Sequence, residues 1–505
     1  MGKKKLAKHA LLALWLAAAG MLLGGCVNQI SEREMVDLSQ KAFKSMTQAP
    51  MQDGVQEHEE TMTLYFLAED GVTLRPVTRS VVVRGGLSRA EAALEALLAG
   101  PLETERGAFW PDLGAARSDR PFEVAAGVAT VDLNAHARTL AQQMLYSVRL
   151  AITNTLTEFP EISYVNVLVG GREEGLDLSA TLSVGTLMHT DELDLSARYS
   201  RLYEQRLSDV GVSLLTTLYF PSADGRMILP QVRHVAYAQA SPIEYLYTIL
   251  EELGKGAGVP LCVDKLPAPL EYIEEMPEIV RTEDGYMAIE LCFNGQLEAD
   301  ILRCGMTLDV YLAMLSDTLM GFVPGVEGLR VSLDGNVLEM LGEDQTRNAE
   351  VLDFEHGLMT RNDFVDYVGT PVKLYAMQDD DLAAMQYVME QSYADNGRAR
   401  LEAMIKLSGT DVFVLPQGLT ASDILSIYTG TDMIAVNLSE NFRRAMESLS
   451  VQQERAAVYA MVNTLTEGMN ASRVQFFFEG EQVSTLAGAL EMRGSFVRNP
   501  GMVVN

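Results

Sequence analysis

Basic side chains are scarce in this chain of 505 residues. It carries 39 lysines and arginines against 69 aspartates and glutamates, which gives a formal net charge of −30. Binding to nucleic acid requires a basic face that neutralises phosphate groups. The charge balance therefore argues against nucleic acid as a partner, and it indicates a body kept soluble by self-repulsion.

Cysteine is also scarce. Four cysteines occur, and three of them, Cys262, Cys292 and Cys304, lie in the body of the chain. Their spacing matches no zinc-binding pattern, and no pair of histidines accompanies them. We interpret them as small buried hydrophobic side chains or as one disulfide bridge with a third thiol left over. No metal site and no cofactor is expected.

Motifs that carry catalysis are missing from the sequence. The six histidines are dispersed, and there is no nucleophile elbow, phosphate-binding loop or dinucleotide fingerprint. Acidic clusters do occur, but their spacing does not follow the calcium-binding loop, so we interpret them as solvated turns. These clusters are Glu173-Glu174, Asp191–Asp194 and Asp379–Asp381. No catalytic residue is assigned, and the chain is not expected to be an enzyme.

One long apolar run stands at the N-terminus. Four lysines, Lys3, Lys4, Lys5 and Lys8, precede the apolar stretch Ala10–Leu23. This stretch has the length of a signal-peptide core and is short for a membrane span. It ends in Leu23-Gly24-Gly25-Cys26, which resembles the lipobox of bacterial lipoproteins.

The lipobox resemblance implies processing and lipidation. Cleavage would fall between Gly25 and Cys26, and the thiol of Cys26 would carry diacylglycerol, with palmitate among its acyl groups. We therefore expect a signal peptide at 1–25 and a polar tether at 26–60, with a short helix around Glu32–Lys44. The membrane partner would be reached through diacylglyceryl-Cys26, and the protein would lie on the extracytoplasmic face of the cell membrane. The alternative is an uncleaved signal anchor with an incidental cysteine.

The pentapeptide Asn-Thr-Leu-Thr-Glu occurs twice, at Asn154–Glu158 and Asn463–Glu467. Strand-like runs with similar openings occur three times, at intervals far longer than a solenoid unit. They begin at Leu64-Tyr65, Leu218-Tyr219 and Leu374-Tyr375, and Asp70-Gly71 and Asp224-Gly225 supply turn signals for hairpins in the first two. The sequence therefore predicts three copies of one domain.

A helix with a capping box is expected after the hairpins. Ser88 with Glu91, and Ser241 with Glu244, have the spacing in which each side chain bonds a free backbone N–H at the helix start. Glycine, which favours the backbone conformation that ends a helix, follows each apolar-periodic run. The helices are expected to end at Gly100-Pro101, Gly254 and Gly409.

Strands and a long helix complete each copy. The strand regions are Val124–Asn134, Tyr286–Asn294 and Met433–Asn441. Alternation in Thr130–Leu133 predicts a sheet with one buried face. A long amphipathic helix then carries the pentapeptide on its last turns, ahead of strands Tyr164–Val169 and Val474–Phe478. The middle copy has Ser316–Met320 in that place, before strand Leu329–Leu333.

The pentapeptide allows two interpretations. Asn154, Thr155, Thr157 and Glu158 could form a polar active cluster, or the Asn and Thr side chains could bond the local backbone where the helix turns into a strand. Catalysis rarely needs the same site in several modules of one chain. Recurrence therefore favours the structural role.

The order of hairpin, capped helix, strand pair, long helix and final strand resembles the GerMN domain of sporulation and spore germination proteins. The residues that carry the likeness are Leu64–Phe66, Leu98–Pro101, Val131–Leu133, Asn154–Glu158 and Val165–Gly171, with Val436–Leu438, Asn463–Glu467 and Val474–Gly480 in the third copy. The resemblance implies an α/β (α+β) class of tandem small domains, each a mixed sheet with helices on one face, of the ring-building type. The expected domains are 61–190, 212–345 (divergent) and 370–495.

The family resemblance also implies a function. GerMN domains occur in exported lipoproteins and have no established catalytic residues to transfer. The expected function is a non-enzymatic, membrane-anchored scaffold or assembly factor in sporulation or spore germination, with other envelope or sporulation proteins as partners. The alternative is a lipoprotein that binds the cell wall (peptidoglycan or another glycan) or a small ligand.

Overall fold

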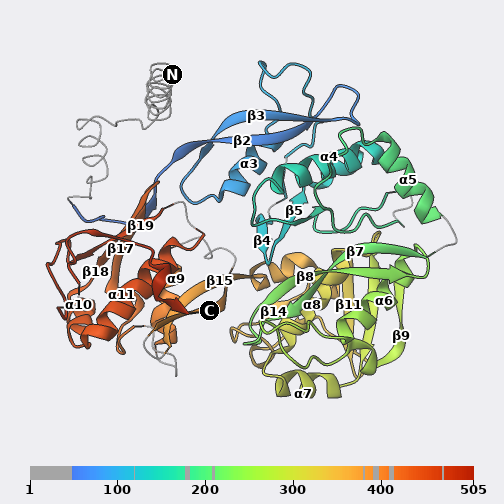
Figure 1. The fold of residues 1–505 in the computed structure, drawn as a ribbon. Coiled ribbons are helices and arrows are strands. Elements are labelled where there is room, and N and C mark those ends of the chain that lie inside the picture. The colour runs from blue at the N-terminus through green and yellow to red at the C-terminus, as the bar shows by residue number, and fades with distance from the viewer. Residues whose placement is uncertain are drawn as a thin grey trace, which may run out of the picture. The chain divides into compact units, whose positions relative to one another are not determined.

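The computed structural model describes residues 48–505, apart from 116, 119, 177–181, 208–210, 379–380, 391–396, 409–414, 469–470, 489 and 505. The expected signal peptide, Gly25, Cys26 and the tether as far as residue 47 lie outside the described residues. Pro50–Asn505 forms one compact unit (Figure 1). No helix within the described ranges is long and apolar enough to cross a membrane.

Three long hairpins confirm the expected repeat (Figure 1). Each pairs two strands of ten residues in continuous antiparallel register. Here the first, second and third repeats are the stretches that these hairpins open. The hairpins are β2 (His58–Leu67) with β3 (Leu74–Val83), β7 (Val212–Pro221) with β8 (Ile228–Tyr237), and β15 (Gly369–Gln378) with β16 (Asp381–Glu390).

A helix follows each hairpin: α3 (Arg89–Leu98), α6 (Pro242–Gly254) and α9 (Gly397–Leu407). The α6 helix ends at the expected glycine, whereas Gly409 lies outside the described residues.

The predicted capping boxes form only by half. The Ser88 and Ser241 hydroxyls accept bonds from the N–H groups of Glu91 and Glu244, at 3.1 and 3.4 Å. The reciprocal prediction is wrong, because both glutamates have other partners. The Glu91 carboxylate pairs with Arg117 at 3.1 Å, and Glu244 accepts from the N–H of Ala238 at 2.9 Å.

Each repeat continues into a small mixed sheet. Its first two strands run antiparallel, and its second strand pairs in parallel with the strand after the long helix. A parallel pair needs a crossover connection, which the helix supplies. The strands are β4 (Glu123–Ala125), β5 (Val128–Leu133) and β6 (Tyr164–Val169); β9 (Ile273–Arg281), β10 (Met287–Phe293) and β11 (Gly328–Leu333); and β17 (Ile424–Thr429), β18 (Met433–Leu438) and β19 (Arg473–Phe478).

The crossover helices form the core of their repeats. All thirteen residues of the second are buried, as expected for a helix covered on every side. Each helix belongs to one of three hydrophobic clusters, which together account for the interior of the three repeats. These helices are α4 (Gln142–Leu156), α8 (Leu308–Met320) and α11 (Val451–Thr466).

Other elements lie within, between and beside the repeats. The third strand region was predicted to extend to Asn441, but the strand ends at Leu438 because Ser439 caps a new helix. The remaining helices and strands are α5 (Ser196–Leu207), α7 (Gln296–Arg303), α10 (Glu440–Glu447), β1 (Gly54–Val55), β12 (Asn336–Val337), β13 (Met340–Leu341), β14 (Leu352–Asp353), β20 (Ser495–Val497) and β21 (Val503–Val504). Short 3₁₀ helices occupy Ala135–Thr139, Pro269–Glu271, Glu343–Gln345, Glu355–Gly357, Arg361–Tyr367, Ala421–Asp423 and Pro500–Met502.

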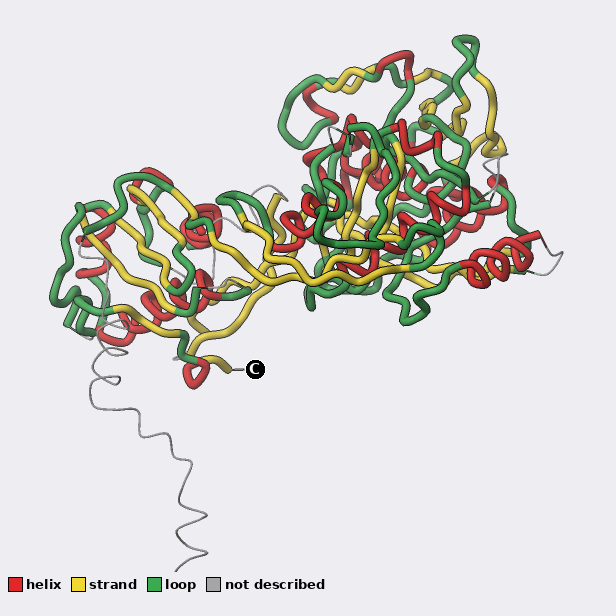
Figure 2. Tube along the Cα trace, turned by 90° about the horizontal axis from the view of Figure 1, so that it is seen from above, coloured by secondary structure: helices red, strands yellow, loops and turns green. Residues whose placement is uncertain are grey.

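The fold class is α+β, as expected. Helices and strands alternate along the described chain, and the strands form small sheets (Figure 2). The boundaries 61–190, 212–345 and 370–495 stay a prediction.

The prediction of one buried face for Thr130–Leu133 is wrong. All six residues of β5 are buried. The second repeat covers the face that was expected to meet solvent: the Thr130 hydroxyl lies 3.4 Å from the Tyr219 hydroxyl, and Asn166 on β6 donates to Thr217 on β7 at 3.1 Å. Thr130 thus meets a polar partner from another repeat, whereas Asp132 is buried against Ser118 and the Gly171 N–H of its own repeat.

The three body cysteines are free thiols. Cys262 is buried, and Cys292 and Cys304 are half-buried. Burial raises the pKa of the Cys262 thiol to about 11, which keeps it protonated and unreactive. Of the two alternatives left by the sequence, the structure shows the small hydrophobic side chains.

The turn glycines of the first two hairpins give a matched test of backbone crowding. Gly225 has φ +68°, and an added Cβ would lie 2.3 Å from the Gly305 carbonyl oxygen. Gly71 has φ +70°, but its added Cβ would meet the movable end of Met144. We expect Gly71→Ala to cost about 1–2 kcal/mol from the left-handed backbone alone. Gly225→Ala should cost more, measured by urea unfolding; equal costs would contradict the crowding.

Candidate functional site

The first threonine of the pentapeptide bonds a distant strand. The Thr155 hydroxyl oxygen accepts a hydrogen bond from the Tyr65 N–H at 2.9 Å, and Thr464 accepts from the Tyr375 N–H at 3.0 Å. The second repeat, which lacks the full pentapeptide, has the same bond at 2.9 Å from the Tyr219 N–H to Thr318. We call these three bonds the threonine latches. Each ties the end of the buried helix to the first strand of its hairpin.

In the first and third repeats, an asparagine precedes the latch threonine and fastens the chain that returns after the last strand. Asn154 donates to the Thr190 carbonyl at 2.9 Å and accepts from the Thr190 N–H at 3.0 Å. Asn463 accepts from the Asn499 N–H at 3.2 Å. A side-chain amide can satisfy the donor and the acceptor of one peptide group, which explains why asparagine suits this position.

The closing glutamate bonds the hydroxyl of the latched tyrosine. Glu158 accepts from Tyr65 at 3.0 Å, and Glu467 accepts from Tyr375 at 2.9 Å. Burial, and then the bond to Glu158, raises the pKa of Tyr65 to about 12. Burial alone would raise the pKa of Glu467, but Tyr375 and the charge of Arg498 outweigh it, so the pKa of Glu467 is lowered.

The residues that could have formed an active cluster are therefore used inside the fold. The structural interpretation of the pentapeptide is supported, but its local form is wrong for Asn154 and Thr155, because their partners lie far along the chain. The second threonine alone behaves as expected: Thr157 donates to the Thr153 carbonyl at 2.8 Å, and Thr466 donates to the Val462 carbonyl at 2.7 Å.

A second recurring bond holds the turn after the last strand. Asp132 accepts from the Gly171 N–H at 2.8 Å, and Asn437 accepts from the Gly480 N–H at 2.9 Å. Gly171 and Gly480 both have positive φ, +79° and +85°, which favours glycine there. The Val-Asp-Leu and Val-Asn-Leu motifs thus serve the turns of their own repeats.

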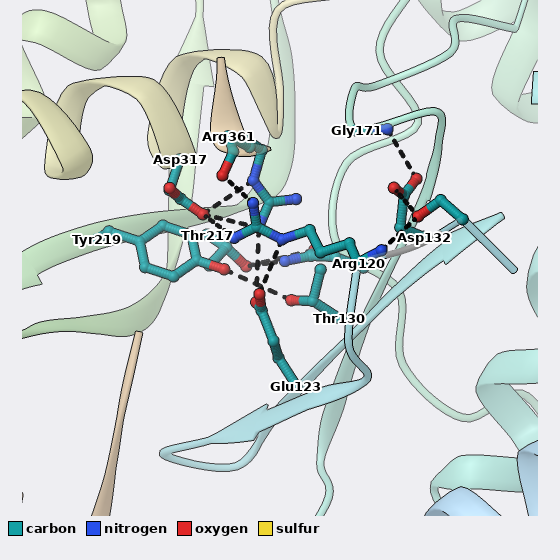
Figure 3. A network of polar contacts seen from close by, with 11 residues as sticks. Arg120, Glu123, Thr130, Asp132, Gly171, Thr217, Tyr219, Asp317 and Arg361 are labelled. Carbon is teal, nitrogen blue, oxygen red and sulfur yellow. Dashed lines mark hydrogen bonds and ion pairs between the residues drawn. The ribbon is translucent and has the colours of Figure 1, made fainter. Parts of the chain in front are cut away.

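The second repeat departs from this pattern at the asparagine position. Asp317 stands there, and its Oδ1 accepts from Arg120 at 3.0 Å and from Arg361 at 2.9 Å (Figure 3). Gly321 takes the place of the glutamate, so the Tyr219 hydroxyl has no acidic partner of that kind and lies beside Thr130 instead. Burial raises the pKa of Tyr219 to about 12.

Glu123 completes a buried charge cluster, which we define as Arg120, Glu123, Asp317 and Arg361. Arg120 donates to Glu123 at 2.8 Å, and Arg361 lies 3.6 Å from the other carboxylate oxygen. Arg120 also donates to the Arg361 carbonyl. The four side chains are at most 3% exposed, and Figure 3 shows them converging from separate elements. Two positive and two negative groups balance the cluster.

Electrostatics within the cluster reflects both burial and pairing. Burial raises the pKa of Glu123, although Arg120 and Arg361 oppose the shift. Burial would lower the pKa of Arg361, but Asp317 outweighs it and the pKa is raised. Removing one member of such a cluster leaves an uncompensated charge in a dry interior, so the four residues depend on one another.

The charge cluster joins the first repeat to the second. Arg120 and Glu123 precede β5, Asp317 lies on α8, and Arg361 begins a 3₁₀ helix after the second sheet. Two backbone bonds of 2.9 Å reinforce the joint, from Glu173 N–H to the Met320 carbonyl and from Thr186 N–H to the Leu215 carbonyl.

The centre of the joint is buried, and its residues bond one another. An ion pair of 3.0 Å between Arg172 and Glu327 lies at its half-exposed margin. The sequence marked Asp317 as a departure from the repeat, but no signal singled out Arg120 or Arg361.

The acidic clusters lie apart from the joint, with one exception. Glu173 is buried, pairs with Arg149 at 3.6 Å and accepts from the Val184 N–H at 2.8 Å, so its assignment to a solvated turn is wrong. The exposed side chains of Asp191 and Asp194 fit that assignment, whereas Asp379 and Asp380 lie outside the described residues. Within the described ranges, no group of three histidine, cysteine or acidic side chains is placed to hold a metal ion.

The element order, the latches and the buried crossover helices define a protein of tandem α+β domains. The family described as sporulation and spore germination (Germane) matches residues 63–175 and 364–484, which lie in the first and third repeats. The first and third repeats are therefore GerMN-type domains, which confirms the expected resemblance in repeated copies. The second repeat lies between the two matched regions, and it has the same order of hairpin, helix, strand pair, long helix and final strand.

Solved structures with some similarity include two from the Bacillus subtilis sporulation protein GerM. Its tandem GerMN domains are 18% identical over 60% of this chain and 99% of that chain, with a TM-score of 0.22. Its first GerMN domain is 20% identical over 27% and 97%, with a TM-score of 0.19. A Clostridium perfringens protein provisionally assigned as a lipoprotein is 17% identical over 26% and 87%, with a TM-score of 0.18. No curated protein sequence matches the chain.

The latch predicts a difference between the two threonines of the third repeat. Thr464→Val removes the acceptor of the buried Tyr375 N–H and should lower the free energy of unfolding by about 1–3 kcal/mol. Thr466→Val removes a hydroxyl that only adds a second bond to a helical carbonyl, and should cost less than about 1 kcal/mol. Urea unfolding followed by circular dichroism measures both. Equal losses would show that the latch contributes nothing specific.

The charge cluster predicts that the family residue is harmful in the second repeat. Asp317→Asn restores the asparagine found in the other two repeats, but it leaves Arg120 and Arg361 with Glu123 as their one anionic partner in the cluster. We expect a loss of about 3–5 kcal/mol, as for breaking a buried ion pair. Glu327→Gln, at the half-exposed pair of the same joint, should cost less than about 1 kcal/mol. Calorimetry of both variants tests this, and an Asp317→Asn protein as stable as the parent would refute it.

Proposed function

We propose that this protein is a non-enzymatic, lipid-anchored scaffold or assembly factor in sporulation or spore germination. The observation that carries the proposal is the match of two of its repeats to the sporulation and spore germination family. The latches support a structural role, because the recurring polar residues of the family motif bond the protein's own backbone and tyrosines. These residues therefore stabilise each repeat from within.

A scaffold needs repeats that keep a fixed relation under load. The charge cluster and the backbone bonds beside it link the first repeat to the second with buried groups on both sides. Opening such a joint would break the charge-assisted hydrogen bonds that Arg120 donates to Asp317 and to the Arg361 carbonyl. We infer that these two repeats present one rigid surface to other envelope or sporulation proteins.

The anchor in this proposal is the lipid on Cys26. It rests on the basic start, the apolar run and the Leu-Gly-Gly-Cys sequence at the expected cleavage point. A chain of formal net charge −30 gains no electrostatic attraction to an anionic leaflet. Attachment therefore has to come from the acyl chains, and more than one chain is needed for stable binding.

Lipidation is the first test. Cells expressing the protein are fed an alkyne analogue of palmitate, and the labelled protein is detected after click chemistry. We expect label on the parent and on Cys292→Ala, which removes a half-buried thiol of β10, and none on Cys26→Ala. Label that persists in Cys26→Ala would overturn the anchor.

The scaffold role is tested by proximity labelling in sporulating and vegetative cells. The parent should enrich sporulation membrane proteins, and Cys26→Ala should lose them while Cys292→Ala retains them. Recovery of wall fragments alone, in both growth states and with both variants, would contradict the scaffold and favour the binding of peptidoglycan.

A further inference from the structure

The segment that leads from the N-terminal region into the first repeat lies on the third repeat. Its strand β1 pairs in parallel with β17, with Gly54 opposite Tyr428 and Val55 opposite Thr429. The next residue continues the pairing, because the Gln56 N–H donates to the Thr429 carbonyl at 2.8 Å. The third sheet thus contains a strand that precedes the first repeat in the chain.

Side chains fix the position of this segment. Both oxygens of the Asp53 carboxylate bond the Arg398 guanidinium, at 2.5 and 3.1 Å, and one also accepts from the Ile427 N–H at 2.8 Å. The Ser426 hydroxyl donates to the Pro50 carbonyl at 2.5 Å. The hydrogen bond from Arg398 lowers the pKa of Asp53, although partial burial opposes this. A bidentate arginine–carboxylate pair adds geometric specificity to backbone pairing.

Among the described residues, the sheets of the other two repeats have no such strand. In the described sheets, β4 and β9 are edge strands, while the corresponding strand β17 is covered on its outer side by β1. The site also has a shape requirement, because a Cβ on Gly54 would lie 3.1 Å from the Tyr428 ring. Exposed strand edges readily accept an extended segment. The third repeat therefore differs from the others in having a sheet edge that is adapted to bind an extended segment.

We propose that the edge of β17 and Arg398 form a strand-acceptor site whose ligand is the chain's own segment Pro50–Gln56. This segment clamps the N-terminal end of the body onto the third repeat before the chain enters the first. Tension applied through the preceding tether is then borne by the third repeat, and the contacts close a loop between the first and third repeats. The site is independent of whether Cys26 carries lipid.

The test cuts the chain beside the segment and asks whether the segment stays bound. A specific protease site is inserted next to Glu57 in the full chain, and the N-terminal fragment carries a tag. After cleavage and gel filtration, we expect the fragment to remain with a body of the mass of one chain. Asp53→Asn should weaken retention roughly tenfold, which corresponds to losing one hydrogen bond to a charged group. Met51→Gln, at a side chain that is 99% exposed in the same segment, is the matched control and should retain the fragment.

Three outcomes would overturn the clamp. In the first, the N-terminal fragment of the parent protein separates from the body after cleavage. In the second, the Asp53→Asn protein retains the fragment as well as the parent does. In the third, the fragment is retained only in a species with the mass of two chains, which would mean that the segment is exchanged between molecules. Arg398→Gln provides a second variant from the acceptor side, and its release of the fragment while the body keeps its circular dichroism spectrum supports the site.

Discussion

A hydrogen bond from a tyrosine backbone N–H to a threonine hydroxyl holds each of the three repeats together. The bonded residues are 90, 99 and 89 residues apart, so the bond joins the hairpin that opens a repeat to its long helix. It reaches the first hairpin strand from a buried helix, where water cannot replace a lost partner. This helix position therefore needs a side chain that accepts the bond, and threonine supplies it in all three repeats.

The second repeat differs from the other two at the residues beside the latch. It keeps the threonine, but aspartate replaces asparagine and glycine replaces glutamate, which removes two links within the repeat. The aspartate instead takes one arginine from the first repeat and one from the chain after its own sheet. A position that closes a repeat on itself has become a joint between repeats, in which Arg120 of the first repeat bonds both Asp317 and the Arg361 carbonyl of the second.

The third repeat differs at its sheet edge. Where the other repeats leave the outer strand at the edge of a sheet, this one pairs it with the segment that enters the body. The three copies thus have the same kind of interior and differ at their surfaces. The second repeat forms a charge joint with the first, and the third repeat accepts a strand. Differences of this kind let tandem copies of one domain take separate roles in a scaffold.

Sequence periodicity determined much of the fold, because hairpins, capped helices and buried crossover helices depend on local patterns of apolar and turn-forming residues. Hence the repeat, the α+β class and the helix end at Gly254 were predictable. Local pattern also misled: Thr130 and Asp132 alternate as if exposed, and Glu91 and Glu244 have the spacing of a capping box. The Glu244 carboxylate bonds the N–H of Ala238, six residues before it. The partners of Glu91, Thr130, Asn154, Asp317 and Asp53 lie tens to hundreds of residues away. Only the tertiary structure decides such pairs, because the chain must fold before distant polar groups can satisfy one another.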